Sequence, residues 1–97
     1  MDIRIQYEGF VAVHASRVYN FLVLDVLRGS RRFAVVVPTE SFRPNSLKFQ
    51  DGPSISFEIL KQELDRETQE SPAKAHLNIA AEDVQQYLRR HFQRKRS

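Results

Sequence analysis

Histidine side chains are the first candidates for acid–base chemistry or metal binding, because they change charge near neutral pH and ligate transition metals. The chain has three, His14, His76 and His91, and no cysteine. The three are far apart in sequence, and no carboxylate accompanies them at a spacing typical of a metal site. We therefore expect histidines at the surface or at strand edges, no metal site and no cofactor.

Paired carboxylates are a second possible source of acid–base chemistry. Glu63 and Glu67 are four residues apart, and such a pair can divide the roles of acid and base when burial separates their pKa values. On the polar face of a helix, however, they are typical of a solvated surface. The chain has only three glycines, no glycine-rich phosphate loop and no G-x-S-x-G motif. We predict a protein without catalytic residues, unless a deep pocket gathers His14, His76 or several carboxylates.

Basic side chains are concentrated in two segments. Residues 1–81 contain ten basic and ten acidic side chains, whereas residues 82–97 contain five basic and two acidic ones and hold the whole net charge of +3. Clustered cations bind phosphate groups with a salt-sensitive affinity. The candidate contacts for nucleic acid or another anion are Arg28, Arg31, Arg32, Arg89, Arg90, Arg94, Lys95 and Arg96. They form one patch only if the hairpin loop and the last helix lie at the same end of the domain.

The two expected helices carry opposite charge. The segment from Glu58 to Glu70 contains five acidic and two basic residues, and the last helix is basic. Cations in the last turn of a helix also complement its dipole. If the helices are neighbours, their charges attract, although exposed pairs contribute only about 0–1 kcal/mol each. Such pairing leaves less basic charge for a nucleic acid, which is therefore the alternative partner and not the main prediction.

Length and composition indicate one small domain. A chain of 97 residues with 41% apolar and 28% charged residues has room for a single modest core. The first residues lack the apolar stretch of a signal peptide, and no run approaches the roughly 20 apolar residues of a membrane-spanning helix. With no cysteine for a disulfide, we expect a cytoplasmic protein. The compactness of the chain is the reason to expect a bacterial one. Residues 1–97 should form the domain, with 93–97 as a basic tail.

Alternating apolar residues predict the strands. They run over residues 2–7, 10–14, 17–27, 32–37 and 76–80, with a turn at Glu8-Gly9 and a hairpin loop at 28–31. Residues 54–60 alternate like a strand, but they also have i,i+4 apolar pairs and lead into good helix formers. We favour a helix from about Ser54 to Gln69 and a second helix from Ala81. The predicted fold is α+β: an antiparallel β-meander of about four to five strands, in the order ββββ-α-β-α, with both helices packed on one face.

The predicted hairpin is apolar on both faces. In its first strand the odd positions include Tyr19, Phe21 and Val23, and the even positions include Val18, Leu22 and Leu24. An antiparallel sheet with one face in water is expected to alternate apolar with polar residues. The two helices can cover one face. The other face then needs a sheet curled into a half-barrel, the loop at 39–53, or a second protein molecule.

This surplus of apolar surface predicts an interaction site. Its candidate residues are Tyr19, Phe21, Val23, Phe33 and Val35. Large exposed apolar patches mark interfaces, and symmetric dimers are the commonest closed assembly. We expect a small non-catalytic interaction or adaptor protein that forms a homodimer, or binds another protein, through its apolar sheet face or edge. A nucleic-acid-binding accessory protein is the alternative.

Overall fold

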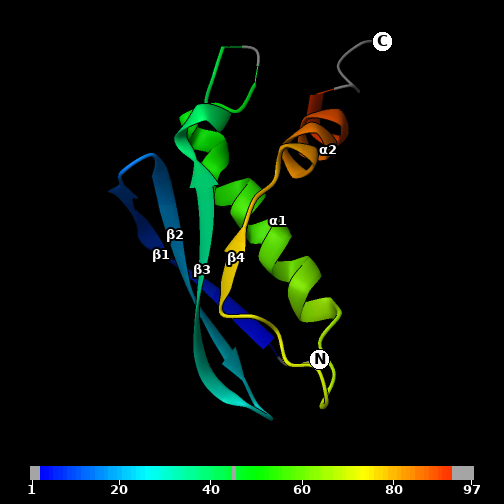
Figure 1. Cartoon of the computed structure of the whole chain (residues 1–97). Helices are drawn as coiled ribbons and strands as arrows, with labels where there is room; N and C mark the ends of the chain where they lie inside the picture. Colours follow the sequence, from blue (N-terminus) through cyan, green and yellow to red (C-terminus); the bar gives the residue numbers. More distant parts are fainter. Residues whose placement is uncertain (1–2, 45, 93–97) are drawn as a thin grey trace.

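The computed structural model describes residues 3–44 and 46–92. Strands β1 (Ile3–Val13), β2 (Ser16–Asp25) and β3 (Gly29–Pro38) are followed by helix α1 (Gly52–Asp65), strand β4 (His76–Asn78) and helix α2 (Ala81–Phe92). The strands form one sheet in the order β1-β2-β3-β4, and both helices lie on the same side of it (Figure 1). The predicted α+β fold with two helices on one face is confirmed. The basic tail expected at 93–97 lies outside the described residues.

β1 is one long strand, where the sequence predicts two short ones. A bulge at Tyr7–Gly9 shifts its register against β2, and Gly9 has a φ of +102°, which glycine tolerates because it has no Cβ. The expected turn at this point is therefore a bulge. It changes the phase of the alternation, so that Tyr7 and Phe10 face the same side of the sheet, where both rings lie beside the ring of Tyr19.

The β2–β3 hairpin is confirmed, with its turn at residues 26–28 and not at 28–31. Asp25 pairs with Gly29, whose φ is +80°, and the Asp25 carboxylate accepts the N–H of Leu27 at 2.8 Å. An aspartate that accepts a backbone N–H two residues further on closes a turn locally. Arg31, which the sequence places in the loop, consequently lies in β3 beside Arg32, and the two residues are on opposite faces of the sheet.

β4 makes the sheet mixed, because it runs parallel to β3 and pairs with Ala34–Val36. Parallel neighbours need a crossover connection, which α1 and its flanking loops supply. β4 ends at Asn78, before the predicted Ala80, whose N–H is instead bonded to the Asp83 carboxylate at 2.8 Å. A carboxylate that reaches back to the residue before a helix is half of a capping box, and it starts α2.

Residues 54–60, for which the sequence allows a strand or a helix, belong to α1. The buried positions of α1 are Gly52, Ile55, Ser56, Leu60 and Leu64, a spacing that places them on one side of a helix. The helix begins two residues earlier than predicted, with Pro53 in the first turn, where a missing N–H is tolerated. It ends at Asp65, before the predicted Gln69, because the chain turns back through hydrogen bonds between Thr68 and Ser71.

The core lies between the sheet and the two helices. Odd-numbered side chains of β2 and β3 point into it, namely Tyr19, Phe21, Val23, Phe33, Val35 and Val37, none of them more than 3% exposed. The helices and the loop after β3 supply the other side, with Leu47, Ile55, Leu60, Val84 and Tyr87. The five residues predicted as an interface are all in this core. They belong to the chain's own packing and are not available as surface.

Candidate interaction surface

The side of the sheet away from α1 and α2 is termed the outer face. By the strand register, Val11, Val18 and Val36 lie side by side across β1, β2 and β3, and Val13 lies two residues further along β1 on the same face. These four residues form the outer valine patch. Val11 is 52% exposed and Val13 is 45% exposed, so the patch faces solvent at the β1–β2 end of the sheet.

The rest of the outer face is more polar than the even positions of β2 suggest. Beside Leu22 and Leu24 it carries Arg4, Gln6, Asn20, Arg32, His76 and Asn78. Glu8 of β1 and Arg32 of β3 form an ion pair across β2, with an N–O distance of 3.2 Å. A hollow of about 530 Å³ beside this pair is lined by Asn20, Ala34 and His76 among others. The continuous apolar surface of this face is therefore the outer valine patch.

Neither of the two covers that the chain itself could supply lies over this patch. The loop between β3 and α1 packs on the helix side, where Leu47 is in the core and the rings of Phe42 and Phe49 stand near Arg17. The sheet is open, with β1 and β4 as its edges. Within residues 3–44 and 46–92, then, no segment of the chain covers the outer valine patch.

The same end of the sheet carries a second exposed group, on the helix side. The guanidinium carbon of Arg17 lies over the rings of Phe10 and Phe49, 4.3 Å and 4.0 Å from their centres. Phe42 stands 5.4 Å from Arg17 and packs against Phe49. These four residues form the arginine clamp. The attraction between a cation and the ring faces orients the guanidinium.

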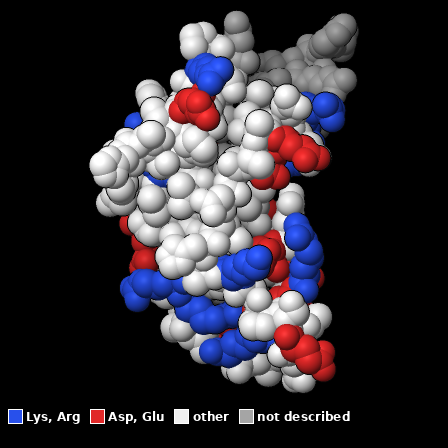
Figure 2. Space-filling view, in the orientation of Figure 1, with Lys and Arg blue, Asp and Glu red and all other residues white. Residues whose placement is uncertain are grey.

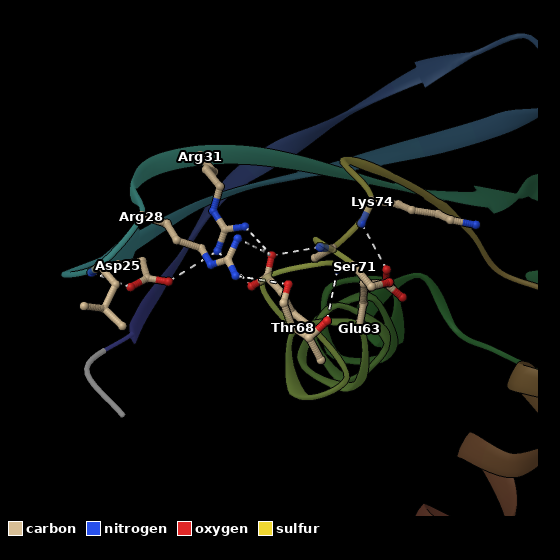
Figure 3. Close-up of polar contacts among 10 residues, drawn as sticks. Asp25, Arg28, Arg31, Glu63, Thr68, Ser71 and Lys74 are labelled. Atoms are coloured by element: carbon tan, nitrogen blue, oxygen red, sulfur yellow. Dashed lines mark hydrogen bonds and ion pairs between the residues drawn. The ribbon is translucent and has the colours of Figure 1, made fainter.

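At the other end of the sheet, two arginines fasten the β2–β3 hairpin to the end of α1 (Figure 3). Arg31 donates to both carboxylate oxygens of Glu67, at 2.6 and 3.3 Å, and also to the Asp25 carboxylate at 3.4 Å. Arg28 donates to the Thr68 carbonyl at 3.2 Å. The Glu67 side chain is 6% exposed, yet the bonds from Arg31 hold its pKa below the usual value.

The basic last helix packs beside the acidic first helix, and their charges pair. Arg90 and His91 of α2 both contact the carboxylate of Glu58 on α1, at N–O distances of 2.5 and 2.7 Å. The ring of His91 also lies 4.2 Å from that of Tyr87, which is buried on the core side of α2. The contacts are near the surface, so they orient the helices more than they stabilise them.

The candidate basic contacts do not gather in one place in the described part of the chain. Figure 1 places the β2–β3 hairpin and α2 at opposite ends of the molecule, so the three hairpin arginines are far from Arg89 and Arg90. Figure 2 shows basic side chains gathered at the hairpin end, with acidic ones among them. Arg94, Lys95 and Arg96 lie outside the described residues. Among the described residues, the hairpin arginines and Arg89 and Arg90 therefore do not form one basic patch.

The residues considered for acid–base chemistry do not form a site. The three histidines are in separate elements, and the two glutamates bind backbone N–H groups. His14 is in the β1–β2 turn, His76 begins β4 and His91 is on α2. No three His, Asp or Glu side chains of the described chain come together in a group that could hold a metal ion. Glu63 and Glu67 each accept a backbone N–H from the loop before β4, at 3.0 and 2.8 Å. Both carboxylates thus hold that loop against α1.

The exposed apolar residues at the end of β1 are not among the predicted interface residues. Phe10, Val11, Ala12 and Val13 are four consecutive apolar residues in a strand, so both faces must be apolar there. Apolar residues on both faces are also the feature that singles out the β2–β3 hairpin in the sequence. In the structure, Phe10, Val11, Ala12 and Val13 are all exposed. The arginine clamp has no such signal, because the rings around Arg17 come from β1 and from the loop after β3.

No protein-family model matches the chain, and neither a curated protein nor a solved structure matches it. Of the described helices, none is long and apolar enough to cross a membrane.

Proposed function

We propose that this protein is a small non-catalytic interaction module that associates with a second copy of itself through the outer valine patch. The observation that carries the proposal is the exposure of Val11 and Val13 on a sheet face that no described segment covers. Removing such apolar area from water is favourable by about 25 cal/mol per Å². A chain without cysteine loses no disulfide in a reducing compartment, and a cytoplasmic location is part of the proposal.

A second copy suits this face in shape and in charge. Two sheet faces can pack at about 10 Å with their strands nearly aligned. A twofold axis through the patch would bring the valines of one copy against the valines of the other. The polar residues beside the patch carry both signs, as in the Glu8–Arg32 pair, so two copies meet without a repulsive field of one sign.

The expected dimer is weak. Stable interfaces bury about 800 Å² on each partner, which is more than four valine side chains provide. The contact must therefore extend over the polar part of the outer face, where Asn20 and Arg32 lie. We expect dissociation in the micromolar range.

Sedimentation velocity over a range of micromolar concentrations tests the proposal. The wild-type protein should pass from an 11.3 kDa monomer toward a dimer as its concentration rises. Val11→Lys combined with Val13→Lys places two cations in each half of the interface and should keep the protein monomeric. The matched control is Val26→Lys combined with Leu27→Lys, at positions 77% and 90% exposed at the other end of the sheet. This control should associate like the wild type.

Two results would contradict self-association through this patch. One is a wild-type protein that stays monomeric up to the limit of its solubility. The other is a dimer that the Val11→Lys and Val13→Lys changes leave intact, or that only the control changes abolish. Circular dichroism of both double variants shows whether they are folded. We expect both to fold, because all four substituted positions are exposed.

A further inference from the structure

Two arginines are partly buried on the helix side of the sheet, one toward each end, and they differ in their partners. Arg31 forms ion pairs with Asp25 and Glu67. Arg17 forms an ion pair with no carboxylate of the described residues, and aromatic rings surround it instead. A guanidinium that has lost part of its hydration gains more from an anion than one in water. Arg17 therefore retains the capacity to bind a carboxylate.

The arginine clamp prepares this side chain for binding. Phe10 and Phe49 hold the guanidinium plane, so Arg17 has less rotamer freedom to lose when a partner arrives. The planar group can donate two parallel hydrogen bonds to one carboxylate. Arginine and aromatic residues, phenylalanine among them, are enriched at protein interfaces relative to the rest of the surface.

We infer that the arginine clamp is a docking site for an acidic side chain of an extended segment from a partner protein. Phe10 belongs to β1, which is an edge strand. No strand of the described chain pairs with the edge of β1 that points away from β2. The stretch Phe10–Val13 follows the bulge and pairs regularly with β2, so its free edge can accept another strand through backbone hydrogen bonds. Alternate side chains of a segment added there face the same side as Phe10, where Arg17 stands.

The surroundings favour a protein segment over other anions. The loop at 39–51 carries two acidic and two basic residues, so Arg17 is not part of the track of cations that a nucleic-acid backbone needs. Phe10 and Phe49 are 44% and 57% exposed, so the clamp is an open surface on which a small anion would stay in water. A peptide that covers the rings with its own apolar residues excludes that water and strengthens the ion pair. The basic segment 93–97 of this chain has the wrong charge for this site.

The arginine clamp and the proposed dimer interface lie on opposite faces of the sheet. Loss of peptide binding and loss of self-association can therefore be told apart. Arg17→Gln removes the cation from the helix side and leaves the outer valine patch untouched. We expect this variant to self-associate like the wild type in sedimentation velocity while it loses the acidic partner. Loss of both properties would mean that the substitution disturbs the fold, and Arg17→Lys then carries the test of the clamp.

Selection from a random dodecapeptide library displayed on phage tests the inference. Peptides that bind the wild-type protein should be enriched in Asp or Glu beside apolar residues. Synthetic copies should bind Arg17→Gln at least about tenfold more weakly, and should lose as much when the acid is replaced by its amide, since both changes remove charge-assisted hydrogen bonds. Arg17→Lys keeps the charge without the planar fork and should fall in between. Arg43→Gln changes an exposed arginine of the loop that supplies Phe42 and Phe49, and this variant should bind like the wild type.

Three outcomes would overturn the inference. The first is a selection without acidic enrichment, and the second is selected peptides that bind Arg17→Gln as tightly as the wild type. The third is a poly-uridine oligonucleotide that binds more tightly than any peptide and depends on Arg17, which would make the clamp a nucleic-acid contact. Two-dimensional NMR spectra of the variants show that losses arise at the clamp and not from unfolding.

Discussion

Gly52, the first residue of α1, lies directly against the side chain of Tyr19 on β2. A Cβ built on Gly52 would be 1.9 Å from the Tyr19 hydroxyl oxygen, far inside any possible contact. The φ of Gly52 is −54°, which is ordinary for a helix. Glycine is therefore required at this position for space and not for backbone conformation, and the contact sets how closely α1 approaches the sheet.

Gly52→Ala should destabilise the domain. In an open helix the change would stabilise by about 0.5–1 kcal/mol, but here the added methyl overpacks the core, which typically costs about 1–3 kcal/mol. Urea denaturation followed by circular dichroism measures the difference. Tyr19→Phe is the matched variant on the other side of this contact. It removes a buried hydroxyl that has no hydrogen-bond partner in the described structure. The free energy of unfolding should therefore change by less than about 1 kcal/mol. If Gly52→Ala unfolds at the same urea concentration as the wild type, α1 can move away from Tyr19.

The Arg31–Glu67 pair makes stability depend on pH. The hydrogen bonds from Arg31 are the largest cause that lowers the pKa of Glu67 in the folded chain below its ordinary value of 4.5. A carboxylate with a lowered folded-state pKa contributes its full stabilisation above the unfolded pKa, and that contribution is lost as the pH falls through the folded-state pKa. The wild-type protein should therefore become less stable below about pH 4.5.

Glu67→Gln separates this pair from the other carboxylates. The variant should be less stable than the wild type at neutral pH, because Arg31 loses its charged partner. Its stability should fall less steeply on acidification, which urea midpoints measured at neutral pH and well below the ordinary glutamate pKa will show. Glu40→Gln is the control, since that side chain is 74% exposed and should leave the acid dependence unchanged. Equal slopes for Glu67→Gln and the wild type would assign the acid sensitivity to other groups.

His14 makes the β1–β2 turn with a φ of 49°, in the left-handed region that non-glycine residues enter at about 1–2 kcal/mol. His14→Gly should relieve this strain and raise the thermal midpoint by a few degrees, as about 0.5–1 kcal/mol does in a domain of this size. Ala15→Gly, one residue further along the same turn and without a positive φ, should lower the midpoint instead. Calorimetry measures the thermal midpoints of both variants. A lower midpoint for His14→Gly than for the wild type would show that the histidine side chain itself stabilises the turn.

The strands, the helices and the opposite charge of the two helices could be predicted because each depends on a local pattern. Glu58 and Arg90, for example, are visible as opposite charges on two helical segments. The face of the sheet that becomes the core could not be predicted in the same way. Tyr19 and Val18 are both apolar neighbours in β2, and only the packing of α1 and α2, which come much later in the chain, buries one and leaves the other on the outer face.

The candidate surfaces depend on details that alternation does not contain. Strict alternation from Tyr7 would place Phe10 on the outer face, but the bulge at Gly9 returns it to the helix side, beside Arg17. Likewise Arg31 reads as a loop residue beside Gly29, whereas the Asp25 side chain closes the turn earlier and draws Arg31 into β3. Single turns and bulges thus decide which charged and aromatic side chains meet.

Leu47 attaches the loop between β3 and α1 to the core, and the arginine clamp depends on that attachment. Leu47 is 2% exposed, and it stands in sequence between Phe42 and Phe49, the two clamp rings that this loop supplies. Leu47→Ala should destabilise the domain by about 2 kcal/mol or more, because it leaves a cavity under the loop.

The same change should release Phe49 from Arg17. The Nε–H resonance of Arg17 should then move toward the position of a free arginine at temperatures where the sheet is still folded. Leu27→Ala is the same substitution at a position that is 90% exposed, and neither effect is expected there. If Leu47→Ala is destabilised but keeps the Arg17 resonance at its wild-type position, the clamp rings are held by their contacts with one another, and not by the anchoring of the loop.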